Sequence, residues 1–385
     1  MISNEKIFKS LKNLKKYVKN YNFLHKPLIE KKDLKFLTQS IKLSEVSTYG
    51  RFTNLFEKKI GKYLKSNNIV STVNGTSALQ SILSYLKVNS EHEVLVQSFT
   101  FVATVNPIIH LGAYPHFIDV SQKTLGADPE KLDNYLSSKK FKFKNGQLIN
   151  NITKKIIKVI IITHSYGYSA EINKLVQVAK KYKLTLIEDA AETIGSQYRK
   201  KKLGTFGDFS ILSFNGNKTI TTGAGGLVIT KKKKDLLKIK HIITTSKVIK
   251  NNKVIYDEPG FNYRMPSLNA ALGLTQIEKL NKILKYKKKL FLFYKNHFKN
   301  FNDLKIFNNF DKNSVNNFWI LLLILDTKKI SKQKFLQNSR KLRIDLKEVW
   351  TPLHKMNYLK KFQKMNLDNS NIIHSKTLCL PSSPT

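Results

Sequence analysis

The feature that most limits the fold of this chain is a series of short apolar runs between residues 69 and 230. Patterns typical of helices separate most of these runs. Strands that alternate with helices form a sheet that is covered on both faces. The sequence therefore predicts an α/β domain whose candidate strands are Ile69–Val73, Glu93–Gln97, Ala113–Asp119, Val159–Ile162, Thr185–Glu188, Phe209–Phe214 and Gly226–Thr230.

The 385 residues exceed one ordinary domain and suggest two. We expect an N-terminal helical lead (1–48), a large domain (49–270) and a small C-terminal α+β domain (271–385). A polar segment at 138–155, with Asn145-Gly146 at its turn, predicts a surface hairpin. The further expected elements are a long bridging helix from Leu268 to about Tyr294 and two strands of the small domain, Phe318–Asp326 and Asp345–Thr351.

A lysine follows one of the candidate strands. Lys218 lies between the apolar run Phe209–Phe214 and a glycine-rich turn that ends at Gly226. Partial desolvation at such a turn makes a lysine amine a usable nucleophile. The alternative, a solvated loop lysine, stays open on this segment alone.

A carboxylate lies 29 residues before this lysine, at the end of another candidate strand. Asp189 ends the run 184–189, and ligands of open α/β sheets bind at the carboxyl ends of the strands. An acid that pairs with a pyridine nitrogen, together with a lysine that traps an aldehyde, is what a pyridoxal cofactor needs. Asp189 is equally suited to cap a helix N-terminus, and that alternative stays open here.

A third segment, Asn74-Gly75-Thr76-Ser77-Ala78-Leu79, joins a candidate strand to a helical pattern. Backbone amides at a helix start, with hydroxyl side chains beside them, can hold a phosphate group. Ser213 adds a hydroxyl five residues before Lys218. An ordinary strand–turn–helix junction is the alternative for this segment.

Taken together, these segments resemble the DegT/DnrJ/StrS family of pyridoxal-phosphate-dependent nucleotide-sugar aminotransferases. The resemblance covers the chain from roughly Tyr49 to Glu278, and the Phe-Asn-Gly-Asn-Lys version is most similar to the legionaminic-acid-type branch. It implies fold type I, with a large mixed, mostly parallel sheet and a small C-terminal domain. The matching segments are 74–79, Ser-Phe-Thr-Phe-Val-Ala-Thr-Val-Asn (98–106), His-Ser-Tyr-Gly (164–167), Glu-Asp-Ala-Ala-Glu (188–192), Ser-Phe-Asn-Gly-Asn-Lys (213–218) and Gly-Phe-Asn-Tyr-Arg-Met (260–265).

The resemblance implies roles for residues around pyridoxal 5'-phosphate (PLP). Lys218 would hold the cofactor covalently and move the substrate proton, and Asp189 would pair with the pyridine nitrogen. Phe101 would stack on the ring, and Glu192 would reach its phenolic oxygen, where many relatives carry Gln. The residues implied for the phosphate are Gly75, Thr76, Ser77 and Ser213.

Other implied roles concern the substrate and a second subunit. Asn262 would reach the phosphate in the neighbouring subunit, which implies a homodimer with composite active sites. Tyr263 and Arg264 would lie near the substrate, although Arg264 could instead hold the interface through a carboxylate pair. His164 would line the pocket, with a purely structural role as the alternative. The substrates would be an amino acid, glutamate above all, and a nucleotide-linked keto sugar, and the cofactor would pass through its pyridoxamine form.

Three departures from the family pattern touch none of these residues. Pro107 interrupts the segment after Asn106, so the helix there should begin near Val102. Ala224 interrupts the glycine run after Lys218. The chain stops at Thr385, where relatives continue, so it is either naturally short or trimmed.

The charge and the length of the apolar runs limit which other classes of protein this chain could belong to. The net charge of +42 suggests nucleic-acid binding, but the lysines are spread along the chain and no DNA- or RNA-binding motif is present. No apolar run approaches the ~20 residues of a membrane helix. With Cys379 as the single cysteine, we expect no disulfide, no cysteine-based zinc site and a cytoplasmic location. A sugar dehydratase of the same fold and a non-catalytic, nucleic-acid-binding protein are the alternatives to a sugar aminotransferase.

Overall fold

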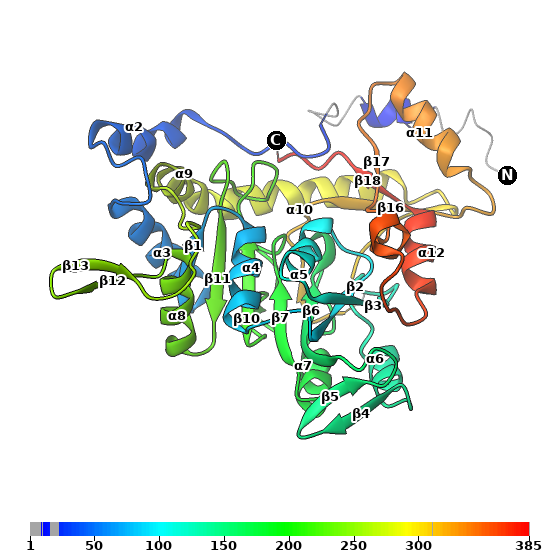
Figure 1. The fold of residues 1–385 in the computed structure, drawn as a ribbon. Helices are drawn as coiled ribbons and strands as arrows, with labels where there is room; N and C mark the ends of the chain where they lie inside the picture. The colour runs from blue at the N-terminus through cyan, green and yellow to red at the C-terminus, as the bar shows by residue number, and fades with distance from the viewer. Residues whose placement is uncertain (1–8, 10, 16–22, 310, 385) are drawn as a thin grey trace.

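The computed structural model describes residues 9, 11–15, 23–309 and 311–384 (Figure 1). Its centre is a large sheet, and all the apolar runs predicted as strands contribute to it. Only β11 on the path below runs antiparallel to its neighbours, so the sheet is mixed and mostly parallel, as predicted. In spatial order the path is β1 (Ile69–Thr72), β11 (Gly226–Thr230), β10 (Phe209–Ser213), β7 (Thr185–Asp189), β6 (Ile156–Thr163), β2 (His92–Gln97) and β3 (Tyr114–Ile118).

Helices cover both faces of this sheet because its strands are apolar on both sides. Val70 and Val228 pack into the core that includes α4 (Gly75–Tyr85) and α8 (Lys233–Ile243). Their neighbours Ile69 and Leu227 pack into a different core, formed with α3 (Arg51–Leu64) and α9 (Ser267–Glu278). Side chains alternate across a strand, so neighbouring residues enter opposite cores. The remaining helices of the large domain are α5 (Asn106–His110), α6 (Pro129–Leu136) and α7 (Ile172–Lys181).

The predicted surface hairpin is confirmed. Strands β4 (Phe141–Lys144) and β5 (Gln147–Asn150) are joined by Asn145 and Gly146, both at positive φ, and project from the body in Figure 1. β5 also pairs with β6, so the hairpin extends the large sheet. A second hairpin, not predicted, has the same kind of two-residue turn and comprises β12 (Lys247–Lys250) and β13 (Lys253–Tyr256). The further short strands are β8 (Gln197–Tyr198), β9 (Lys201–Lys202) and β15 (Ser314–Val315).

The expected bridging helix is two helices rather than one. α9 ends at Glu278, and α10 runs from Leu280 to His297. At the junction, the amide of Lys279 donates to both Thr275 O and Gln276 O, which tightens the last turn of α9.

The small domain contains a four-stranded sheet. The predicted strand Asp345–Thr351 is shorter than expected, because the Trp350 amide leaves the sheet and donates to the hydroxyl of Tyr166 at 3.0 Å. In spatial order the strands are β14 (Leu304–Ile306), β16 (Leu321–Leu325), β18 (Thr377–Leu380) and β17 (Lys347–Glu348). The helices beside them are α11 (Lys332–Lys341) and α12 (Asp368–Lys376), and short 3-10 turns occur at Val102–Thr104, Ser165–Gly167, Leu353–Lys355 and Asn357–Leu359.

The N-terminal lead is helical only in part. Its described residues include an extended stretch at 23–30, a 3-10 turn at Lys31–Asp33 and α2 (Leu34–Lys42). Leu11 and Leu14 pack into the core of the four-stranded sheet, and α2 packs against α9. The lead therefore contacts both the four-stranded sheet and the helices beside the large sheet. The division of the chain at residues 48 and 270 stays a prediction.

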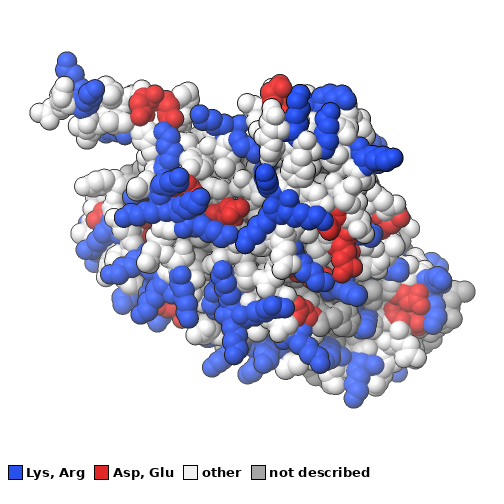
Figure 2. Space-filling view, turned by 90° about the horizontal axis from the view of Figure 1, so that it is seen from below, with Lys and Arg blue, Asp and Glu red and all other residues white. Residues whose placement is uncertain are grey.

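Charged side chains are dispersed over the face of the molecule seen from below in Figure 2. Figure 2 shows Lys and Arg side chains scattered over the face seen from below, with acidic groups between them. Within the described residues, none of the helices has the length and apolarity that crossing a membrane requires.

Candidate active site

The carboxyl ends of β7 and β10 open onto a cavity of about 430 Å³. Tertiary folding brings to this cavity residues that the sequence places more than 140 positions apart, from Gly75 to Lys218. The predicted site residues that line it are Gly75, Thr76, Phe101, Asp189, Glu192, Ser213 and Lys218.

Lys218 points into the cavity and is only 12% exposed. Its Nζ lies 3.1 Å from Oε1 of Glu192 and 4.2 Å from the ring centroid of Trp319. Burial raises the pKa of Glu192 to about 7; Asp189 adds to this effect, and Lys218 opposes it. The arrangement therefore holds a buried amine against a carboxyl group that can exchange a proton near neutral pH.

Asp189 occupies the end of β7 and is 7% exposed. Its Oδ2 accepts a hydrogen bond of 2.6 Å from the Thr104 hydroxyl, and its Oδ1 accepts one of 3.2 Å from the amide of Ala191. Residues 190–196 form turns, so Asp189 does not cap a helix. Its carboxylate is instead held at the cavity wall.

The start of α4 offers backbone donors to the same cavity. The side chain of Asn74 caps the helix by accepting from the amide of Ser77 at 2.7 Å. The amides of Gly75 and Thr76 have no acceptor within the helix, because the first amides of a helix never do. Strand β11 reaches this turn only because residue 226 is glycine: a Cβ there would lie 2.4 Å from the carbonyl of Asn74.

His164 does not line the cavity, contrary to the expectation for this residue. It is fully buried; its Nδ1 accepts from the Ala170 amide at 3.2 Å, and its Nε2 donates to Glu188 at 2.9 Å. Burial alone would raise the pKa of Glu188, but the bonds from His164 and from the amides of Gly207 and Gly204 hold it below its usual value. This histidine joins strand ends, which is the structural alternative.

The segment 262–264 also lies outside this cavity within one protomer. Asn262 is exposed, and the hydroxyl of Tyr263 donates to Gln80 at 3.2 Å. Arg264 donates to Asn54 at 3.4 Å, while its Nε is buried without a partner. Among the described residues of this chain, Arg264 takes part in none of the ion pairs, and its pair across a subunit interface stays a prediction.

Two tryptophans in the cavity wall were not predicted. Trp319 and Trp350, the only two in the sequence, both come from the predicted small domain. The ring of Tyr166 stacks on Trp350 at 4.1 Å and on Trp319 at 6.2 Å. The rarity of tryptophan was the one available signal, because nothing local places residues 319 and 350 beside residue 218. Thr104 was missed in the same way.

Comparison with known proteins identifies the family of this chain. The sequence model of the DegT/DnrJ/EryC1/StrS aminotransferase family matches residues 27–385. GDP-perosamine synthase of Escherichia coli O157:H7 is 31% identical over 344 residues, which cover 89% of this chain and 88% of that protein. The UDP-4-amino-4,6-dideoxy-N-acetyl-beta-L-altrosamine transaminase of Campylobacter jejuni (strain 81-176) is 30% identical over 363 residues, covering 92% and 90%.

A solved structure supports the fold. The PLP form of Spr1654 from Streptococcus pneumoniae superposes with a TM-score of 0.82 at 20% identity, covering 93% of this chain and 92% of that one.

Proposed function

The chain belongs to the DegT/DnrJ/EryC1/StrS aminotransferase family, and from that membership we propose how its site works. It is a sugar aminotransferase that transfers an amino group to the keto carbon of a nucleotide-linked sugar. The observation that carries the proposal is the convergence of Lys218, Glu192 and Asp189 in one cavity beside the start of α4. The intact lysine argues against a sugar dehydratase.

The residues present fit PLP as the cofactor. Free amides at the start of α4 and the hydroxyl of Ser213 would hold the phosphate, and Gly75 leaves room, since a Cβ there would lie 3.1 Å from Ser213 Cβ. Asp189 would face the pyridine nitrogen, and Phe101, 51% exposed at the cavity edge, would cover the ring. When bound, PLP supplies an aldehyde and an electron-withdrawing ring.

The chain's own residues supply positioning and proton transfer. Glu192 can take a proton from the Lys218 amine across 3.1 Å, which leaves the amine free to react. Because burial raises the pKa of Glu192 to about 7, this carboxyl group can hold a proton near neutral pH. When Lys218 carries the proton, its contact with the Trp319 ring stabilises the cationic amine. Thr104 holds the Asp189 carboxylate in place.

The finer features remain part of the proposal. We take glutamate as the amino donor and a legionaminic-acid-type pathway as the setting, on the motif resemblance alone. A homodimer would bring the exposed Asn262 of the partner subunit to the phosphate, with Tyr263 and Arg264 near the substrate. A cytoplasmic location suits the buried free thiol of Cys379.

The test is the visible absorption of the purified protein with added PLP, before and after L-glutamate. We expect a yellow protein that bleaches with glutamate. Lys218→Ala should abolish both the colour and the bleaching without lowering the melting temperature of the cofactor-free protein. A wild-type protein that binds no PLP, or a Lys218→Ala variant of full activity, would refute the proposal.

A further inference from the structure

The imidazole of His25 is buried beside the active site without a well-formed hydrogen bond. His25 belongs to the N-terminal strap, defined here as residues 23–33. Neither ring nitrogen makes a hydrogen bond of good geometry among the described residues, although the backbone of Asn217 lies close enough to act on the pKa of the ring as a weak hydrogen-bond partner. The ring lies 6.4 Å from that of Trp319, centroid to centroid. A buried polar group that stays unpaired destabilises the fold. A ligand that enters the neighbouring cavity can complete the hydrogen bonds of such a group.

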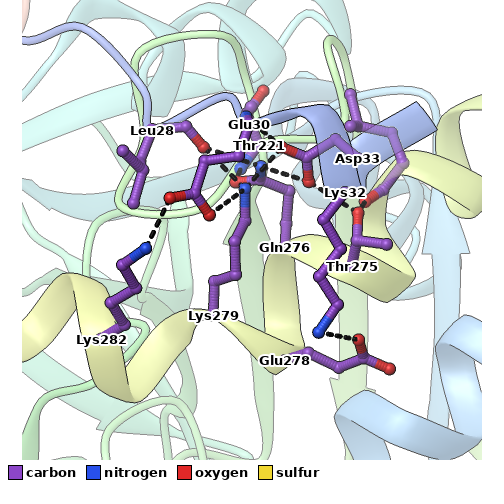
Figure 3. Close-up of polar contacts among 11 residues, drawn as sticks. Leu28, Glu30, Lys32, Asp33, Thr221, Thr275, Gln276, Glu278, Lys279 and Lys282 are labelled. Carbon is purple, nitrogen blue, oxygen red and sulfur yellow. Dashed lines mark hydrogen bonds and ion pairs between the residues drawn. The ribbon is translucent and has the colours of Figure 1, made fainter. Parts of the chain in front are cut away.

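The position of His25 is fixed by its neighbours along the strap. The amide of Leu24 donates to Asp345 at 2.9 Å, and the amide of Lys26 donates to the Ser383 hydroxyl at 2.9 Å. At the other end, Asp33 is bound by groups of α9 and the α9–α10 junction (Figure 3). The unpaired ring is therefore not the consequence of a loosely held segment.

His25 lines a second cavity, of about 330 Å³, that adjoins the first. The two cavities share Asn217, Trp319 and Trp350 as wall residues. Within this second cavity the acidic groups already have partners: Asp345 binds the Leu24 amide and Lys347, and Glu348 binds Lys332. The histidine nitrogens are buried groups of this cavity that can still bind a ligand.

Burial and two nearby lysines favour the neutral form of this ring. Burial above all, and then the charges of Lys287 and Lys218, hold the pKa of His25 well below its usual value, although the backbone of Asn217 opposes them. A neutral imidazole has one donor and one acceptor nitrogen. It therefore matches a hydroxyl group with both nitrogens, or a carboxylate with its N–H.

We propose that His25 is a further substrate-binding residue, whose imidazole hydrogen-bonds an oxygen atom of a substrate where the two cavities meet. The inference rests on the proposed function and extends it to a residue far from the motifs of the family resemblance. The oxygen belongs either to a hydroxyl of the sugar or to a carboxylate of the amino donor, and the two half-reactions distinguish these sources.

The test uses His25→Leu, which removes both nitrogens at similar size, and His25→Gln, which restores hydrogen bonding. His110→Asn, at an exposed site at the end of α5, is the matched control for loss of an imidazole. The PLP-loaded proteins are mixed with L-glutamate and, separately, with GDP-perosamine or UDP-4-amino-4,6-dideoxy-N-acetyl-beta-L-altrosamine, and the rate of bleaching is followed against concentration. Melting temperatures are measured on the cofactor-free proteins.

We expect His25→Leu to keep or raise the melting temperature, because no internal hydrogen bond is lost. Its apparent kcat/KM should fall about tenfold with the donor whose oxygen His25 binds, and His25→Gln should recover part of that loss. If kcat/KM falls with glutamate alone, His25 binds the carboxylate of the amino donor. If it falls with an amino sugar alone, His25 binds a hydroxyl of the sugar. Unchanged rates with every donor that the wild type accepts would overturn the proposal.

A melting temperature of His25→Leu far below that of the wild type, with rates that His25→Gln does not restore, would also overturn it, since that pattern indicates a structural residue. A wild-type protein that never turns yellow contradicts the proposed function instead.

Discussion

Replacing Asp33 by Asn tests whether one buried ion pair fastens the N-terminal strap to the rest of the molecule. Asp33 is 2% exposed and lies 2.5 Å from Nζ of Lys279, which is 5% exposed (Figure 3). The same carboxylate accepts from Thr275 at 2.7 Å and from Gln276 at 3.1 Å. Asn keeps the shape of the side chain and part of these bonds but removes the charge.

The expected loss follows from the burial of the partner. Removing one member of a buried ion pair costs about 3–5 kcal/mol, because the other charge stays buried and uncompensated. Lys279 keeps a hydrogen bond of 3.0 Å to Leu28 O, and Glu30 lies 3.8 Å away. We therefore expect the lower end, about 3 kcal/mol of unfolding free energy at neutral pH.

The pH dependence has a definite sign. Burial raises the pKa of Asp33, but hydrogen bonds from Lys279, Glu30, Thr275 and Gln276 outweigh it, so the pKa in the folded protein is lower than normal. The contribution of Asp33 is therefore complete above the normal aspartate pKa and is lost as the pH falls through the folded value. The difference between wild type and Asp33→Asn should shrink in acid.

The assay is urea unfolding of the cofactor-free protein, followed by tryptophan fluorescence at neutral and acidic pH. Lys32→Ala is the control: its pair with Glu278, at 3.6 Å, is exposed and should contribute at most about 1 kcal/mol. Asp33→Asn combined with Lys279→Met should cost less than the two single changes added together, because no buried charge is left unpaired. A loss below about 1 kcal/mol for Asp33→Asn, or a loss that does not change with pH, would refute the reasoning.

Two further predictions concern the cavity. Glu192→Gln removes a carboxyl whose pKa is raised from 4.5 to about 7, chiefly by burial and against the effect of Lys218. The folded wild type binds this proton more tightly than the unfolded chain does, so the melting temperature of the wild type should fall as the pH rises from 4.5 to about 7. If Glu192→Gln shows the same fall, Glu192 is not the group responsible. Gly226→Ala would place a Cβ 2.4 Å from the Asn74 carbonyl, so we expect a loss of about 1–3 kcal/mol and weaker PLP retention by absorbance. Gly216→Ala, whose Cβ would meet only Gly223 O at 3.8 Å, is its control, and equal effects of the two changes would refute the steric argument.

The sequence predicted the large sheet well because its strands are buried on both faces. β6, for example, reads as an almost unbroken apolar run, with Val159–Ile162 fully buried. The positions of Asp189 and Lys218 followed from the same pattern, since each comes at or just beyond the end of such a strand. Local signals also placed the turn at Asn145-Gly146, where both residues have positive φ.

The remaining wall of the site could not be read from local pattern. Trp319 contacts Lys218 from a distant part of the chain, and the indole N–H of Trp319 donates to Asn217 O across 102 positions of sequence. Lys279 reaches Asp33 across 246 positions. No periodicity or spacing encodes such pairs, because they depend on how distant segments of the chain and the strap are packed.

The strap carries an unpaired buried imidazole at His25 and a buried ion pair at Asp33. His25 leaves two buried nitrogens unpaired, and each such group destabilises the fold by about 1–3 kcal/mol. The ion pair of Asp33 and Lys279 lies eight residues further along and ties the strap to the α9–α10 junction. A segment selected for stability alone would place an apolar side chain at position 25. The strap keeps a polar one against Trp319, next to the reacting lysine, and its stability comes from the other end. A ligand-binding residue needs a rigidly held backbone and side-chain groups that are free to hydrogen-bond the ligand. The strap provides the first through Asp33 and the second through His25.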